Sequence, residues 1–177
     1  MLRDGTDDGG SSTSVASRED ESSAPDKHAG GEKLFREMGR SVGIEDETLN
    51  NVIQSVSGET WRKRRAGLHL FLNYMNSKKL HIVDILHGRS DIVLANALTW
   101  REKQGGKSML EEMRKMKTHA GVALSMFSDV SNINQSPVVQ AIVKRLGLER
   151  QTKSKYSSVW NLNLLTKFIM RSGLGTA

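Results

Sequence analysis

The sequence contains no cysteine, and this absence excludes several kinds of site. Without cysteine the chain can form neither a disulfide framework nor a cysteine-based zinc finger, and it has no thiol nucleophile. Proline (2 residues) and aromatic residues (4 Phe, 3 Trp and 2 Tyr) are scarce as well. This composition is more typical of a helical globular protein than of a many-stranded sandwich.

Long hydrophobic runs are also missing. No apolar run approaches the roughly 18 residues that cross a bilayer, and the N-terminal region lacks the apolar segment of a secretory signal. We therefore expect an intracellular protein with no membrane partner, located in the nucleus if its host is a eukaryote. Its 177 residues are enough for one domain with a tail, since domains mostly contain about 100 to 200 residues.

Charge is distributed unevenly along the chain. Residues 1–32 carry 3 basic and 8 acidic side chains, a net charge of −5, whereas residues 33–177 carry 23 basic and 12 acidic side chains, a net charge of +11. The first 31 residues are rich in Asp, Glu, Gly and Ser, so we predict a disordered acidic tail over 1–31. The basic remainder is expected to attract a polyanion, most commonly nucleic acid; a lysine-rich surface that only keeps the protein soluble is the alternative.

Hydrophobic spacing is helical along nearly all of the remaining chain. We predict a short helix or arm over 32–44, helices at about 46–56, 60–78 and 91–103, a longest helix opened by Ser108, and further helices at 137–147 and 158–170. The expected boundaries are a glycine end at Gly58, a cap at Thr60, the pair Gly105-Gly106, and a Ser136-Pro137 start for the helix that ends at Gly147. Strand signals are almost missing. The predicted fold is therefore all-α, a compact bundle of about five or six helices after the tail.

The helix opened by Ser108 shows the clearest amphipathic pattern. Its apolar residues recur at alternating spacings of four and three, and we expect this stripe to be buried: Met109, Met113, Met116, Ala120, Ala123, Phe127 and Val130. The residues predicted to point away from the stripe are Arg114, Thr118, Gly121 and Ser125, with Lys115 and Lys117 at its edges. Small and basic residues on an exposed face suit close approach to a phosphate backbone.

No motif of enzymatic chemistry is complete. Gly106-Lys107-Ser108 resembles the end of a nucleotide-binding loop, but Arg101 stands where that loop requires glycine. The five histidines show no metal-ligand spacing, and no serine is paired with a histidine and an acid at informative spacing. We therefore expect no enzymatic activity, no metal, no cofactor and no small-molecule substrate.

The strongest functional signal is the run Arg62, Lys63, Arg64 and Arg65, predicted to lie on the first turn of the helix capped by Thr60. The helix dipole opposes positive charge there by roughly a few tenths of a kcal/mol for each side chain, so a compensating anion is expected. A DNA phosphate at that helix N-terminus would accept hydrogen bonds from both the backbone and the arginines. The alternative is a solvated run of charges that lies over the core.

The order of these features resembles the N-terminal core-binding domain of tyrosine recombinases and integrases. The residues that carry the resemblance are Thr60-Trp61 through Leu68-His69-Leu70-Phe71-Leu72, Asp84-Ile85, Ser108 with Lys117-Thr118-His119, and Ser136-Pro137-Val138-Val139 with Lys144-Arg145-Leu146-Gly147. Further along, Lys155-Tyr156-Ser157-Ser158-Val159-Trp160-Asn161-Leu162 is similar to the passage that joins this domain to the catalytic domain in recombinases of DIRS-type retroelements. Ser154, Lys155 and Asn161 depart from that pattern. The resemblance covers about residues 46–170.

The resemblance implies a SAM-like helical bundle that grips one side of a recombination site, with double-stranded DNA and further recombinase protomers as partners. It divides the chain into the tail 1–31, the helix or arm 32–44, a DNA-binding core over 45–149, and a basic connector with a C-terminal helix over 150–177 that leads toward an absent catalytic domain. The family cuts DNA with a tyrosine, assisted by two arginines, a lysine and a His-x-x-Arg pair. No histidine here has arginine three residues later, and Tyr74 and Tyr156 are the only tyrosines. We therefore expect a role in DNA recombination or integration through DNA binding alone.

The residues expected to bind DNA lie on three of the predicted helices. They are Arg62, Lys63 and Arg65 on the first, Arg114, Lys115, Lys117, Thr118, His119 and Ser125 on the second, and Lys144 and Arg145 on the third. The basic side chains are expected to contact phosphates, and Thr118, His119 and Ser125 to meet base edges. The competing hypothesis is a helical protein-interaction module without a nucleic-acid role, in which Met109, Met113, Met116 and Met126 form an adaptable apolar surface.

Overall fold

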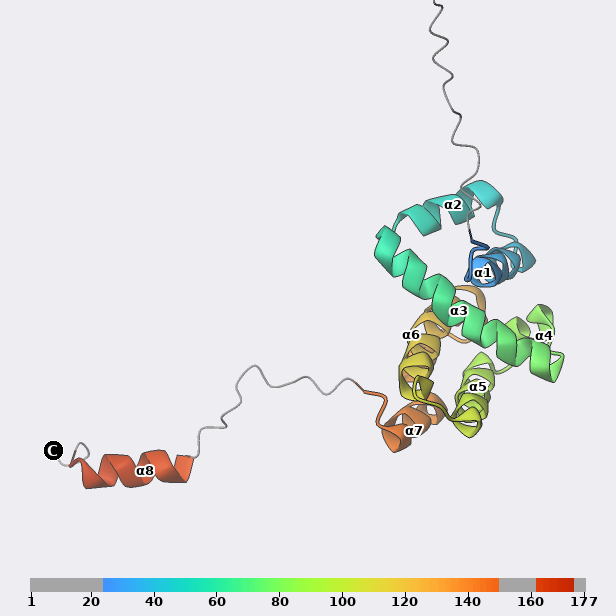
Figure 1. The fold of residues 1–177 in the computed structure, drawn as a ribbon. Coiled ribbons are helices and arrows are strands. Elements are labelled where there is room, and N and C mark those ends of the chain that lie inside the picture. Colours follow the sequence, from blue (N-terminus) through green and yellow to red (C-terminus); the bar gives the residue numbers. More distant parts are fainter. Residues whose placement is uncertain (1–23, 150–161, 174–177) are drawn as a thin grey trace, which may run out of the picture.

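The computed structural model describes residues 24–149 and 162–173, and every regular element in these two ranges is helical. The elements are α1 (Ala29–Ser41), α2 (Asp46–Gln54), α3 (Gly58–Lys78), α4 (Ile82–His87), α5 (Ser90–Gln104), α6 (Met109–Phe127), a 3₁₀ turn η1 (Ile133–Gln135), α7 (Pro137–Leu146) and α8 (Leu162–Arg171) (Figure 1). The predicted all-α class is confirmed. Eight α-helices lie in the described ranges, against about five or six expected.

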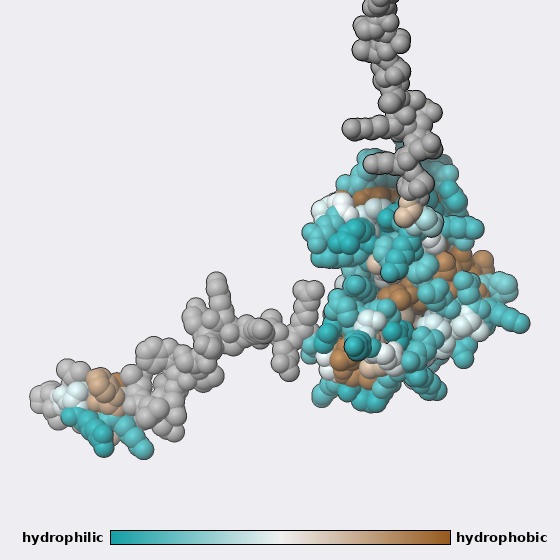
Figure 2. All heavy atoms as spheres, in the orientation of Figure 1, coloured by the Kyte–Doolittle hydropathy of each residue, from teal (hydrophilic) through white to brown (hydrophobic). Residues whose placement is uncertain are grey.

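The helix α3 is the main support of the bundle. Both α1 and α6 pack along it, and α5 packs against α6 and α7 on the side away from α1 (Figure 1). The contact between these helices buries Leu68 and Phe71 of α3 completely, together with Met113 and Met116 of α6. Removal of this apolar surface from water is the main contribution to the stability of such a bundle. Outside the core, much of the visible surface is hydrophilic, with apolar patches between the polar side chains (Figure 2).

The helix α1 belongs to the core and is not an arm. It begins at Ala29, so the last three residues of the predicted tail, 29–31, are helical. Residues 1–23 of that tail lie outside the described residues. The ring of Phe35 is 1% exposed and lies edge-on to Trp61 of α3 at 5.1 Å and to Phe127 of α6 at 4.9 Å. A Cβ atom on Gly31 would lie 2.0 Å from the backbone oxygen of Arg65, so only glycine allows α1 to approach α3 this closely.

The start of α3 differs from its prediction. Gly58 does not end α2, which stops at Gln54; it is the first residue of α3. The cap is Ser57, whose side chain accepts a hydrogen bond from the backbone N–H of Thr60. The basic run 62–65 therefore lies beyond the first turn, where the helix dipole opposes positive charge only weakly. The helix dipole therefore gives no reason to expect a compensating anion at this end of α3.

Other boundaries agree more closely with the sequence. Pro137 begins α7, and Gly147 ends it in the left-handed conformation at φ 62°, as predicted. Gly105 ends α5 at φ 64°. The helix α6 contains 19 residues and is shorter than α3, which contains 21, so it is not the longest. The short helix α4, which buries Ile85 and Leu86, was not predicted.

The helix α8 corresponds to the predicted final helix. Its expected start at about residue 158, the basic connector and Tyr156 lie outside the described residues. In the part of α8 whose side chains are described, Phe168 is 65% exposed and Met170 80% exposed. Within the described ranges, no helix combines the length and the apolar character needed to cross a membrane.

Candidate nucleic-acid interface

The predicted DNA-binding residues lie on α3, α6 and α7, in agreement with their sequence assignment. Figure 1 shows α6 between the other two helices. Seven of the basic side chains on these helices lie in two groups, and the predicted residues Arg62, Arg65 and Lys117 belong to neither. The α3–α6 group contains Lys63, Arg64, Lys115 and His119, and the α7-end group contains Arg114, Lys144 and Arg145.

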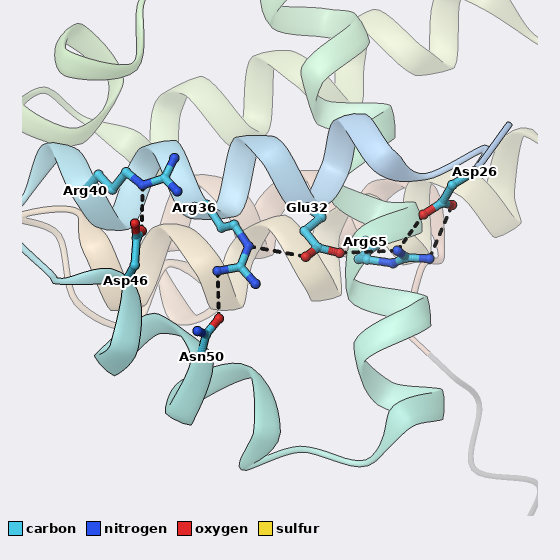
Figure 3. Close-up of polar contacts among 7 residues, drawn as sticks. All are labelled: Asp26, Glu32, Arg36, Arg40, Asp46, Asn50 and Arg65. Carbon is cyan, nitrogen blue, oxygen red and sulfur yellow. Dashed lines mark hydrogen bonds and ion pairs between the residues drawn. The ribbon is translucent and has the colours of Figure 1, made fainter.

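Arg65 is held in ion pairs with two carboxylates of the chain. Its Nη1 atom lies 2.7 Å from Oδ2 of Asp26 and 3.3 Å from Oε2 of Glu32 (Figure 3). The Arg65 side chain is only 20% exposed. The N–H of His28 and the Arg65 guanidinium keep the pKa of the Asp26 carboxyl below its ordinary value. Arg65 is therefore engaged with carboxylates of the chain, and its predicted role in binding phosphate is not supported by its position.

The neighbouring arginines of α1 are bound in the same way. Arg36 bridges Glu32 and Asn50 of α2, and Arg40 donates to Asp46 of α2 at 2.7 Å (Figure 3). These contacts join α1 to α2 just as Arg65 joins α1 to α3. The positive charge on this side of the bundle is thus largely neutralised by local carboxylates.

The two lysines of the α3–α6 group are paired only weakly. Lys63 lies 2.8 Å from Glu59, and Lys115 lies 3.9 Å from Glu111, each one turn away on the same helix. All four side chains are more than 40% exposed. Exposed pairs of this kind contribute about 0.3 to 0.5 kcal/mol, so both lysines can exchange their partner for a phosphate at low cost.

Arg64 belongs to the basic run 62–65 but was not among the residues expected to bind DNA. It is 8% exposed, and its Nε atom is buried without a hydrogen-bond partner. The signal for this burial was present in the spacing, because Arg64 precedes Leu68, Phe71 and Met75 by four, seven and eleven positions on the apolar stripe of α3. The basic run thus contains one exposed arginine, one paired arginine and one buried arginine.

His119 faces α3 and not the solvent side of α6. Burial, together with the positive charges of Arg64, Lys63 and Lys115, lowers the pKa of His119 to about 4. Its Nδ1 atom is buried without a hydrogen-bond partner. The Cβ atom of His119 lies beside Gly67 of α3, a position that does not favour the predicted contact with base edges.

The small residues of α6 serve packing against η1. A Cβ atom on Gly121 would lie 2.2 Å from Oδ1 of Asn134, and the hydroxyl of Ser125 donates to the Gly121 carbonyl and accepts from the backbone N–H of Ile133. Gly121 and Ser125 were predicted to point away from the buried stripe on an exposed face of α6; that exposure is wrong, because η1 covers them. Thr118 is exposed, as predicted.

The α7-end group contains both paired and unpaired cations. Lys144 is exposed and forms no ion pair with the described residues, whereas Nη2 of Arg145 lies 2.5 Å from Oε2 of Glu102 on α5. Arg114 donates from Nε to the backbone oxygen of Leu148, just beyond the end of α7, at 3.4 Å. Of these three cations, Lys144 is the most available to a ligand.

The structure leaves little of the methionine surface that the competing hypothesis requires. The predicted buried stripe of α6 is confirmed, and within it Met113 and Met116 are 0% exposed in the core. Met109 is partly buried against the same core, and Met126 is 46% exposed. A continuous methionine surface is therefore not formed.

Two other buried charged groups have complete sets of partners. Arg101, also 8% exposed, donates to Glu112 and to the backbone oxygen of Gly105. Asp91 is 2% exposed and accepts from Arg89 and from the hydroxyl of Ser136, contacts that hold the pKa of its carboxyl well below the usual range. These contacts join α5 to α6 and α7 and serve the fold.

No group of three or more His, Asp or Glu side chains placed to hold a metal occurs within residues 24–149 and 162–173. Comparison of the chain with protein-family models, with curated proteins and with solved structures finds no match.

Proposed function

We propose that this protein binds double-stranded DNA through the basic side chains of α3, α6 and α7. In this proposal it acts in DNA recombination or integration, in the manner of the core-binding domain of a tyrosine recombinase, and it does not cut DNA itself. Its further partners would be recombinase protomers on the same DNA. Its expected place of action is inside the cell, in the nucleus if the host is a eukaryote.

The observation that carries the proposal is that four of the predicted DNA-binding cations on these helices have no carboxylate partner among the described residues. Arg62, Arg114, Lys117 and Lys144 form no ion pair with the described residues, although the chain forms such pairs readily elsewhere. They belong to a part of the chain, residues 33–177, with a net charge of +11. Unpaired arginine and lysine side chains are the groups that bind DNA phosphates and release counterions.

The ion pairs reduce the set of expected phosphate contacts. Arg65 and Arg145 are held by carboxylates from other helices, which leaves six of the eight basic candidates: Arg62, Lys63, Arg114, Lys115, Lys117 and Lys144. Thr118 is the remaining exposed candidate for a base edge, because Ser125 and His119 face other parts of the protein.

Fluorescence anisotropy with a labelled DNA duplex tests this function. The double variant Arg62→Gln/Lys144→Gln should bind the duplex more weakly than the wild type. The double variant Lys33→Gln/Lys78→Gln removes the same charge from exposed positions outside the proposed surface and should bind nearly as well. If both double variants lose the same affinity for the duplex, binding depends only on the net charge of the protein, and the proposed surface is contradicted.

Size-exclusion chromatography supplies the complementary measurement. If the wild-type protein does not bind duplex DNA at low salt but associates with itself or with another protein, the proposal is overturned. That outcome would favour the competing hypothesis of a helical interaction module.

A further inference from the structure

The buried guanidinium of Arg64 lacks the partners that the fold gives to its other buried arginine. Arg64 and Arg101 are equally exposed, at 8%. Arg101 is neutralised by Glu112 and also donates to a backbone carbonyl, whereas Arg64 makes no hydrogen bond or ion pair with any described residue. Burying a charge without a partner costs free energy, and an anion that paired with the charge would offset this cost. The unpaired guanidinium of Arg64 should therefore attract an anion strongly.

The crossing of α3 and α6 brings further positive groups to Arg64. Gly67 lies one turn further along α3, where a Cβ atom would be 2.6 Å from the backbone oxygen of Lys115 and 2.7 Å from Cβ of His119. This close contact places Lys115 and His119 of α6 beside the face of α3 that carries both Gly67 and Arg64. Lys63 also lies close enough to affect the ionisation of His119.

His119 adds a second buried group without a partner. Its Nδ1 atom, like Nε of Arg64, is buried and makes no hydrogen bond. The charges that act on His119 come from Arg64, Lys63 and Lys115, and all of them are positive. The carboxylates near this position, Glu59 and Glu111, are exposed and bind only the two lysines. An oxyanion between the helices would therefore meet donors from both and no buried carboxylate.

We propose that Arg64 and His119 form the floor of a binding site for a single phosphate group, with Lys63 and Lys115 at its rim. The site rests on the proposed function in one respect: the phosphate it takes is a phosphodiester of the DNA backbone at the α3–α6 crossing. A guanidinium fork matches the oxygens of a phosphate, an imidazole N–H adds one further donor, and the lysines supply mobile positive charge. Arg64 is not fully closed off from solvent, since 8% of the residue stays accessible, and the phosphate would reach it at that accessible part.

The direct test compares Arg64→Met with Lys78→Met, which removes one positive charge from an exposed position at the far end of α3. Arg64→Met should weaken duplex binding by roughly tenfold or more, the loss expected for charge-assisted hydrogen bonds to one phosphate. Lys78→Met should change it by much less. Equal affinities of the two variants would overturn the site while leaving the DNA-binding function intact.

Thermal melting of the same variants separates a ligand site from a structural role. Replacement of an unpaired buried charge by an apolar side chain of similar length should leave Tm unchanged or raise it. A lower Tm for Arg64→Met, combined with wild-type affinity for the duplex, would assign Arg64 to the fold and contradict the proposal.

A measurement on the wild-type protein does not depend on any variant. Inorganic phosphate, titrated into the protein while the His119 ring signals are followed by NMR, should produce a saturable shift and raise the pKa of His119 from about 4. No change in these signals with phosphate or with duplex would overturn the site. A response to inorganic phosphate from a protein that does not bind duplex would support the site and overturn the proposed DNA function.

Discussion

Lys144 and Arg145 are adjacent on α7, yet the structure predicts different contributions to DNA binding. Lys144 forms no ion pair with the described residues, whereas Arg145 is bound to Glu102. Replacement of either side chain by glutamine removes one positive charge from the last turn of the same helix. The two variants therefore test whether pairing with a carboxylate, and not charge alone, decides which cations bind phosphate.

The expected salt dependence of DNA binding follows from the release of counterions by the phosphates that the protein neutralises. The logarithm of the binding constant falls with the logarithm of the salt concentration at a slope of about −0.9 for each phosphate neutralised. The eight basic candidates of the sequence would give a slope of roughly −7. The six that remain after Arg65 and Arg145 are set aside give a slope of roughly −5.

Anisotropy titrations of one labelled duplex at several salt concentrations supply the slope. Lys144→Gln should make it less steep by about 0.9, whereas Arg145→Gln should leave it nearly unchanged. If the two variants change the slope equally, the ion pair with Glu102 does not prevent Arg145 from binding a DNA phosphate. A slope near zero for the wild type would refute the phosphate-binding surface as a whole.

Three other perturbations probe the scaffold that holds this surface. Ser136→Ala should lower the free energy of unfolding in urea by about 1.5 to 3 kcal/mol, because Asp91 loses a hydrogen bond to its buried carboxylate; an unchanged midpoint would contradict this. Gly31→Ala should cost about 1 to 3 kcal/mol, since its Cβ would lie 2.0 Å from a backbone oxygen of α3, whereas Gly58→Ala meets no heavy atom within 4 Å and should melt like the wild type. Stability should fall as the pH drops from about 6.5, the ordinary pKa of histidine, toward about 4, the pKa of His119 in the folded protein. In this range the unfolded chain binds a proton at His119, whereas burial and the neighbouring cations keep folded His119 neutral. His119→Leu should flatten this part of the profile, and a profile that stays steep would assign the loss to other groups.

The helical class of the protein was predictable because helix formation depends on residues close in sequence. The alternating spacing of apolar residues in α6 predicted its buried stripe, and the Ser136-Pro137 start and Gly147 end predicted the limits of α7. The start of α3 was missed because both Ser57 and Thr60 are good caps, and only the folded chain shows that Ser57 accepts the hydrogen bond.

The candidate site was predictable only in part. The sequence placed the basic residues on the correct three helices, but it assigned Ser125 and Gly121 to an exposed face that η1 covers. It also treated Arg62 to Arg65 as one cluster, although neighbouring residues on a helix point in directions about 100° apart. Which of these side chains is exposed to solvent depends on how helices from other parts of the chain pack against α3.

The sequence by itself determined the helical class, the order of most helices and the excess of positive charge after residue 32, because these depend on composition and on local spacing. Only the tertiary structure decided which cations stay available. The carboxylates that bind Arg65 lie 39 and 33 positions away, and the one that binds Arg145 lies 43 positions away. Arg64 is buried where α6 crosses α3 at Gly67. Pairing and burial arise where distant segments meet, so no local pattern of residues specifies them.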